Sequence, residues 1–283
     1  ECARLALGVS TFDSLAKEQF QLHAYALFIT GDIIALEKLL GINGHNAFCP
    51  CQGCRIRGFR MESTGGTIYY VPLAEPIECQ SGPKQKSWSP DNLPLRTPET
   101  NEAAIRAIEE AATKKQKKEL ICHHVIKKHP VLRCVGSLDH TKCAPWDWMH
   151  LFLENNCPNL VKLWTGNFKG LDEGVEEYEL SPDDWEQIGQ ETADAVKDIP
   201  ASFVRVLANI AQDQSKFTAE SWGFWFMYIA PVVLKGRFQN EKYYKHLCDF
   251  VDIMKISIQL EITREQVDDL EQKIIQWVRE YEE

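Results

Sequence analysis

An apolar run that ends at a single acid constrains the fold more than any other stretch of this chain. Residues 20–30 read FQLHAYALFIT, a nearly continuous apolar segment of strand length, typical of a strand covered on both faces. Gly31 and Asp32 end the run, and IIALEKLLG then places apolar residues near one helical face before Gly41. The pattern predicts a strand, a turn and a helix, with the Asp32 carboxylate at the carboxyl end of a buried strand.

The rest of the chain predicts an α/β protein in which helices predominate. Residues 61–98 are polar and rich in Gly, Pro and Ser, apart from the short strand candidate TIYYVPL, and indicate a long insertion. Residues 98–120 and nearly everything beyond Pro145 have helical patterns. Helix N-terminal capping signals occur at Ser181 and Thr263.

These patterns divide the chain into four predicted parts. They are the end of a sheet with Asp32 and a cysteine-rich knuckle (1–60), an insertion or extended connection (61–144), a helix carrying Glu154 (145–170) and a helical C-terminal region (171–283). The first residue is Glu rather than Met and the last residues still have a helical pattern, so we expect a fragment of a longer protein.

Composition and charge narrow the class of protein. The 283 residues, 44% of them hydrophobic, suffice for a real core, and the net charge of -10 argues against a simple nucleic-acid coat. Residues 171–200 alone hold 11 Asp+Glu and 1 Lys+Arg, whereas residues 1–170 hold 17 and 20. The longest apolar run, residues 222–234, is shorter than the roughly 20 residues of a bilayer span. We expect a soluble protein with reduced thiols.

A second informative stretch, PWDWMHLFLENNCPNLVKLW, carries acids and an imidazole together. On an α-helix, Asp147, His150 and Glu154 fall within about 60 degrees of one another. One interpretation is structural, with Asp147 capping the helix and His150 pairing with Glu154 on a solvated face. The other is catalytic, because Asp32 and Glu154 are the kind of acids that a two-metal phosphodiester site requires.

The stretch GHNAFCPCQGCRIRGFR, residues 44–60, suggests a zinc knuckle. Cys51 and Cys54 have the C-x-x-C spacing of tetrahedral zinc sites, and Cys49 and His45 lie close enough in sequence to complete one. A second set of potential ligands precedes Glu154, namely Cys122, His123, His124, His129, Cys134 and Cys143. The alternative interpretation is that these cysteines are small buried hydrophobic residues.

Three arginines, Arg55, Arg57 and Arg60, follow the cysteines. They are candidates for contacts with DNA phosphates, although arginines on a loop are also common at protein surfaces.

Several motifs in a fixed order resemble the catalytic region of CACTA-type (En/Spm-like) transposases of plant and fungal genomes. They are GDIIALEKLLGINGHNAFCPCQGC, YYVPL, NLPLRT, WDWMHLFLENNCPNLVKLWTG and FTAESWGFWFMYIAPVVL, and they cover most of the chain. The resemblance implies a partial RNase H-like (DDE transposase) core. In that family three acids bind Mg²⁺ or Mn²⁺ ions that drive DNA cleavage and strand transfer.

By resemblance, Asp32 matches the second acid of the family and Glu154 the third, while Asp147 and His150 would orient Glu154. The first acid would lie upstream, so we expect this fragment to be inactive alone. Asp13 has polar surroundings that indicate a loop and make it a poor substitute. Ile34 stands where many relatives carry Pro.

The resemblance also implies the partners and the location. They are transposon-end and target DNA, a homo-oligomer in a synaptic complex and the nucleus, with no membrane. It places a C-x-x-C pair between the second and third acids, which agrees with structural Zn²⁺ at Cys51 and Cys54. The alternative function is a non-catalytic, zinc-stabilised DNA- or protein-binding domain of a domesticated or decayed transposon.

Overall fold

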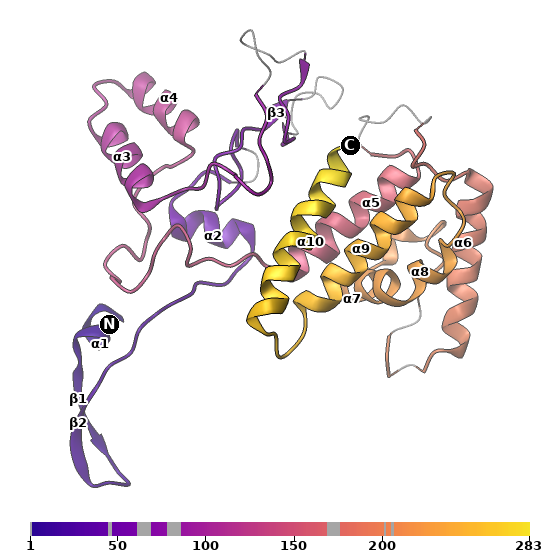
Figure 1. Ribbon diagram of the computed structural model, residues 1–283. Coiled ribbons are helices and arrows are strands. Elements are labelled where there is room, and N and C mark those ends of the chain that lie inside the picture. The colour runs from indigo at the N-terminus through magenta and orange to yellow at the C-terminus, as the bar shows by residue number, and fades with distance from the viewer. Residues whose placement is uncertain are drawn as a thin grey trace. The chain divides into compact units, whose positions relative to one another are not determined.

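The protein divides into two compact units, Glu1–Asp147 and Trp148–Glu283. The computed structural model describes residues 2–44, 47–60, 69–77, 86–168, 176–200, 202–204 and 207–283, without the side chains of residues 60, 69 and 70. Helices predominate in the described parts, together with two short antiparallel sheets of two strands each (Figure 1). The chain is therefore α/β and predominantly helical, as the sequence predicts.

The first unit combines small hairpins with three longer helices. Its elements are α1 (Cys2–Leu7), β1 (Val9–Asp13), β2 (Glu18–Leu22), α2 (Ile33–Leu40), β3 (Phe59–Arg60), β4 (Tyr69–Tyr70), α3 (Pro98–Glu109) and α4 (Lys114–His124). β1 pairs with β2 from Val9 opposite Leu22 to Asp13 opposite Glu18. The YY of the predicted TIYYVPL strand forms β4, which pairs with β3.

The prediction of a buried strand over residues 20–30 is wrong. β2 ends at Leu22, and the chain from 23 to 32 is not a strand. Tyr25, Leu27 and Phe28 are 60%, 62% and 68% exposed. An apolar run becomes a buried strand only where strands flank it and side chains cover both faces, and the described residues supply neither for this segment. Asp32 therefore follows an exposed apolar arm, residues 23–30, rather than a buried strand.

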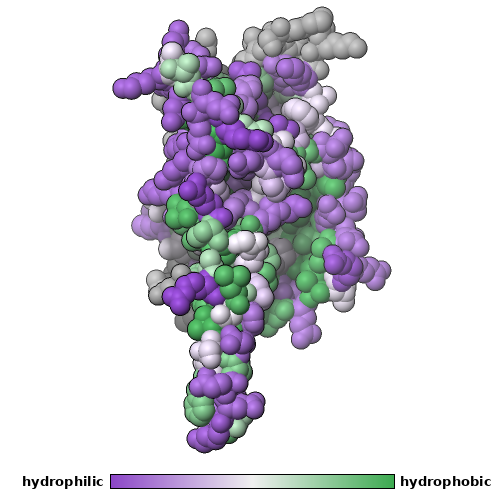
Figure 2. All heavy atoms as spheres, turned by 90° about the vertical axis from the view of Figure 1, so that its left-hand side faces the viewer, coloured by the Kyte–Doolittle hydropathy of each residue, from purple (hydrophilic) through white to green (hydrophobic). Residues whose placement is uncertain are grey.

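The arm is attached to the first unit at a few points. The Ile29 amide donates to the Cys143 carbonyl at 2.8 Å, and the Ser137 hydroxyl donates to the Ala26 carbonyl at 2.8 Å. Hydrophobic side chains also alternate with hydrophilic ones along the β1–β2 hairpin, at the lower end of Figure 2. Phe12 and Leu15 on this hairpin are 53% and 93% exposed.

Helix α2 forms where the sequence predicts it. The Asp32 carboxylate accepts a hydrogen bond from the Ala35 amide at 2.6 Å and caps the first turn. Gly41 ends the helix with φ of 69°, a left-handed conformation that glycine adopts without strain. The core of this unit joins α2, α3 and residues 126–143, through Leu36, Leu40, Ile42, Ala104, Ile105, Ile108, Ile126, Val135, Leu138 and Cys143.

The second unit is helical throughout its described elements. They are η3 (Met149–Asn156, a π-helix), α5 (Cys157–Trp164), α6 (Pro182–Ala195), η4 (Val196–Asp198), η5 (Gln214–Lys216), α7 (Ala219–Phe224), η6 (Trp225–Ile229, a π-helix), α8 (Ala230–Val233), α9 (Glu241–Ser257) and α10 (Arg264–Glu282). The predicted capping residues are confirmed, because Ser181 and Thr263 accept hydrogen bonds from the amides of Asp184 and Gln266.

Aromatic residues fill the centre of the second unit. Trp225 and Phe226 are completely buried, and the Trp225 indole donates to the buried Thr192 hydroxyl at 3.0 Å. Phe250 of α9 contacts Phe226 edge to face. In the part of the chain that the structure describes, no helix has the length and apolar character needed to cross a bilayer.

A histidine of α9 packs against α10. The His246 ring stacks on the Trp277 ring at 4.6 Å, and the Trp277 indole donates to the His246 carbonyl at 3.1 Å. Burial lowers the pKa of His246, and Lys245 adds to the lowering. The contact of His246 Nε2 with the Trp277 carbonyl at 3.1 Å opposes it, as do the nearby Glu280 and Asp249 carboxylates. The unfolded chain, in which histidine titrates near about 6.5, therefore takes up this proton more readily than the folded chain.

This difference predicts that α10 loosens in acid. The stability from neutral His246 is fully present above about pH 6.5 and is lost as the pH falls below it. Hydrogen-exchange protection of α10, corrected for intrinsic rates, should be lower at pH 5 than at pH 7.5. His246→Phe, which keeps a stacked ring without titration, should remove most of this pH dependence. The control His123→Phe, at an exposed histidine of α4, should keep it; equal pH dependence in both variants would refute this role.

Candidate functional site

The predicted acid Asp32 has a defined structural position. It lies immediately before α2, partly buried, with one carboxylate oxygen held by the Ala35 amide. Such a cap contributes about 1 kcal/mol to stability, so Asp32 has a role in folding whatever its role in chemistry. The positive end of the helix dipole also favours a negative group at this place.

Glu154 lies on the π-helix η3 of the second unit. Its Oε2 is 3.6 Å from His150 Nε2, which confirms the predicted i,i+4 pair, and the two side chains are 47% and 38% exposed. Asp147 directly precedes Trp148, the N-cap residue of η3. The element is a π-helix, whose turn is wider than that of the α-helix assumed for the predicted stripe. π-helical turns often occur at functional sites.

Backbone amides of the cysteine loop point to the sulfur atom of Cys51. Cys51 Sγ accepts hydrogen bonds from the Gly53 amide at 3.3 Å and the Cys54 amide at 3.1 Å. The hydrogen bond between the Cys51 and Cys54 side chains lowers the pKa of Cys51 to about 6 and raises the pKa of Cys54. A thiolate at Cys51 is the form that ligates a metal ion.

A buried arginine organises this loop. Arg96 is only 3% exposed, and its guanidinium donates to the backbone carbonyls of Cys51 (3.1 Å), Cys49 (3.3 Å) and His124 (3.3 Å). Its amide donates to the Gly53 carbonyl at 2.9 Å. Burial lowers the pKa of Arg96, and the cysteines beside it oppose this effect. Motif spacing did not single out Arg96, although an arginine inside the apolar NLPLRT segment is a signal of a buried polar anchor.

The other predicted zinc ligands are placed as follows. Cys49 Sγ points to the Arg55 carbonyl at 3.7 Å, and His45 lies outside the described residues. Within those residues, no group of three or more His, Cys, Asp or Glu side chains is arranged to hold a metal ion. Cys51 and Cys54, whose side chains are hydrogen-bonded to each other, could supply two of the four ligands of a tetrahedral zinc site.

The second set of potential ligands is dispersed over the first unit. Cys122 and Cys134 are exposed, whereas Cys143 is buried in the core. His129 Nε2 lies 3.4 Å from a Glu109 carboxylate oxygen. These side chains therefore lie in different environments, which their spacing in the sequence did not reveal.

The arginines after the cysteines differ in the contacts that their side chains make. Arg55 and Arg57 are exposed, and the Arg57 guanidinium lies 5.0 Å from the centre of the Phe48 ring and 5.9 Å from that of Phe59. The Arg60 side chain is outside the described part. Arg55 is therefore better placed than Arg57 to contact an external phosphate.

Comparison of the chain with protein-family models, curated proteins and solved structures gives no match. The chemistry of the candidate residues has to be inferred from the residues themselves. In the first unit these are a capping acid before α2 and a cysteine loop held by a buried arginine. In the second unit the candidate is an acid paired with histidine on η3.

Proposed function

We propose that this chain is part of the catalytic region of a DDE-type DNA transposase of the CACTA (En/Spm-like) type. The ordered motifs quoted above support the proposal. The order of these motifs is the observation that carries it, and the structure adds that Asp32 caps α2 and that the half-exposed Glu154 lies on η3. Both carboxylates are held by local contacts rather than by strong ion pairs, and so remain suitable as metal ligands.

The proposed core is RNase H-like. A two-stranded hairpin is marginal in water, and the β1–β2 hairpin and the arm expose apolar residues that further strands would cover. The resemblance places such strands upstream of this sequence.

The resemblance assigns an oxygen ligand of the metal ions to Asp32 and another to Glu154, and His150, 3.6 Å from Glu154 Oε2, would position that carboxylate. Bound there, Mg²⁺ or Mn²⁺ would supply Lewis-acid activation of water or of a 3′-hydroxyl toward a phosphodiester. The partners would be transposon-end and target DNA, in a nuclear synaptic complex of several copies.

The test separates the two roles of Asp32. Asp32→Asn keeps a capping side chain and removes the carboxylate, whereas Asp32→Ala removes both and should cost about 1 kcal/mol of stability. We expect Asp32→Asn and Glu154→Gln each to weaken Mn²⁺ binding at least tenfold with little change in melting temperature. Glu37→Gln on the same helix α2 is the control and should bind Mn²⁺ normally.

Two results would contradict the proposal. If both acid variants bind Mn²⁺ with unchanged affinity, Asp32 and Glu154 are not metal ligands. Robust DNA nicking by this chain alone, lost in Asp32→Asn, would show that the chain already contains every acid it needs, contrary to the assignment of an upstream first acid.

A second candidate function is a zinc-stabilised binding module that performs no chemistry. The two amide hydrogen bonds to Cys51 Sγ favour it. We expect protein purified without chelators to retain about one zinc per chain, and Cys51→Ser/Cys54→Ser to lose it. Cys2→Ser/Cys248→Ser, at two cysteines outside both sets of potential ligands, is the matched control. Absence of zinc, or equal zinc in both double variants, would exclude a knuckle at Cys51 and Cys54.

A further inference from the structure

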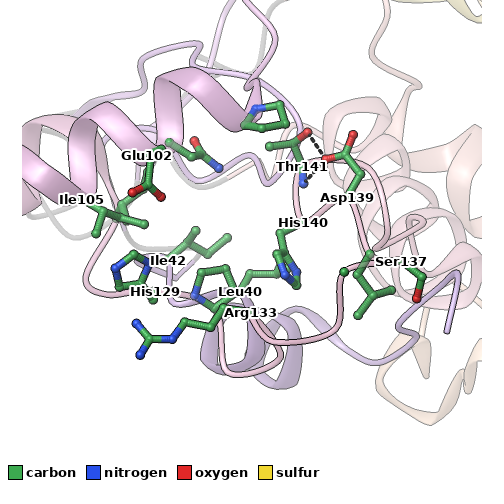
Figure 3. A pocket seen from close by; sticks show the side chains of 16 residues that line it. Leu40, Ile42, Glu102, Ile105, His129, Arg133, Ser137, Asp139, His140 and Thr141 are labelled. Atoms are coloured by element: carbon green, nitrogen blue, oxygen red, sulfur yellow. Dashed lines mark hydrogen bonds between the residues drawn. The ribbon is translucent and has the colours of Figure 1, made fainter. Parts of the chain in front are cut away.

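A cavity of about 520 Å³ lies within the first unit, between the end of α2, the first turns of α3 and residues 126–141 (Figure 3). This volume is in the range of sites for small organic ligands. Aliphatic side chains line part of the cavity, from Leu40, Ile42, Ile105, Ile126 and Leu138. Glu102 and His129 lie on one side of it and His140 lies opposite.

Some polar groups of the cavity already have partners inside the protein. The Asp139 carboxylate accepts from the Thr141 amide at 2.9 Å and the Thr141 hydroxyl at 2.7 Å. Ser137 is engaged with the Ala26 carbonyl, and His129 with Glu109. These residues shape the wall and leave few of their own donors and acceptors for a ligand.

Four other polar groups are unused. Within the described residues, the side chains of Asn101, Glu102 and Arg133 make no hydrogen bond or ion pair, and His140 Nδ1 is buried without a partner. Burial lowers the pKa of His140, against the effect of Asp139, so the ring is neutral at neutral pH. A ligand with an apolar body and an edge of hydrogen-bond donors and acceptors fits these groups.

Residues 126–133, several of which line the cavity, end a stretch of the chain that is rich in cations. Residues 106–133 hold 8 Lys+Arg and 3 Asp+Glu, in a chain whose net charge is -10. Within the described part, none of the exposed lysines of this stretch forms an ion pair; they are Lys114, Lys115, Lys117, Lys118, Lys127 and Lys128. The first four occupy the N-terminal half of α4, where cations oppose the helix dipole and reduce stability. An anion bound along α4 relieves this repulsion.

We propose that the cavity holds one unpaired nucleotide of a DNA strand whose phosphates lie along α4 and residues 127–133. The inference rests on the DNA function proposed above and describes how the chain binds its DNA substrate. The apolar faces of the base contact the aliphatic side chains, and its edge meets Asn101, Glu102 and His140. The Glu102 carboxylate favours a base that carries an exocyclic amino group, and Arg133 at the cavity binds the adjoining phosphate.

The first experiment places 2-aminopurine at an unpaired position of a DNA duplex. Its fluorescence, quenched by stacking, should rise several-fold when the wild-type chain binds. Asn101→Ala/Glu102→Gln should abolish most of this rise while leaving the affinity for DNA within about threefold, because the phosphates carry most of the affinity. Glu110→Gln, exposed at the end of α3, is the control and should behave as wild type.

The second experiment measures how DNA affinity depends on salt. Replacing Lys114, Lys115, Lys117 and Lys118 by Gln should reduce the slope of log affinity against log salt by up to about 3.6. The control replaces Lys197, Lys216, Lys235 and Lys245 by Gln, which changes the net charge equally. It should leave the slope nearly unchanged, because these lysines belong to the second unit and three of them pair with acids.

The outcomes distinguish this inference from the function on which it rests. A fluorescence rise that persists in Asn101→Ala/Glu102→Gln overturns the cavity proposal alone, and equal slopes in the two lysine variants overturn the proposed path of the phosphates. Absence of DNA binding at low salt overturns the DNA function as well.

Discussion

Gly41→Ala should destabilise the first unit by about 3 kcal/mol or more, since two penalties combine at this residue. Its φ of 69° is strained for any residue with a Cβ, which costs about 1 kcal/mol or more. An added Cβ would also overlap the Lys128 carbonyl oxygen and lie 3.0 Å from that of His129. The backbone at Gly41 and that at residues 127–129 cannot move apart easily, because the Lys127 amide donates to the Gly41 carbonyl at 2.7 Å.

The effect can be measured by urea unfolding followed by hydrogen exchange on peptides from α2 and residues 125–135. Gly236→Ala is the matched control, because its φ of 72° is equally left-handed but nothing lies within 4 Å of an added Cβ. This control should cost only about 1 kcal/mol in the second unit. Equal costs at the two glycines would show that residues 125–131 do not fix α2 in place.

Arg96→Met should have an effect of similar size, about 3 to 5 kcal/mol in the first unit. Methionine fills part of the space but leaves the carbonyls of Cys49, Cys51 and His124 without their buried donor. The cysteine loop and the end of α4 should then exchange amide hydrogens much faster than in the wild type. Loss of the guanidinium also raises the pKa of Cys51 from its lowered value, because the arginine favours the thiolate.

The control for Arg96 is Arg57→Met on the same loop. Arg57 is exposed over the Phe48 ring, and its removal should cost no more than about 1 kcal/mol. Urea unfolding monitored by exchange in peptides 48–58 and 118–126 compares the two variants directly. An Arg96→Met protein as stable as Arg57→Met would mean that water replaces the guanidinium without loss.

Structural features that a few adjacent residues determine were predicted correctly. Asp32 and Gly41 bound α2, and Ser181 and Thr263 begin α6 and α10, because a cap is decided by one side chain and the amides next to it. The pairing of His150 with Glu154 is local in the same sense.

Features that depend on distant partners were not predictable from the same reasoning. The exposure of Tyr25, Leu27 and Phe28 depends on which segments cover them, and composition cannot supply that information. The π-helical turn of η3 was not predicted, and Arg96 gained its role from carbonyls up to 47 residues away in sequence. The candidate acids could therefore be identified from sequence, whereas their surroundings could not.

The exposed arm also affects how the protein behaves in solution. Unpaired strand edges on the β1–β2 hairpin and the apolar side chains of Tyr25, Leu27 and Phe28 can adhere to other molecules of the same chain. The net charge of -10 opposes such adhesion by mutual repulsion, and salt weakens that repulsion. Colloidal stability should therefore fall as protein concentration and ionic strength rise. A solution that is clear in dilute buffer should become turbid through aggregation when salt is added.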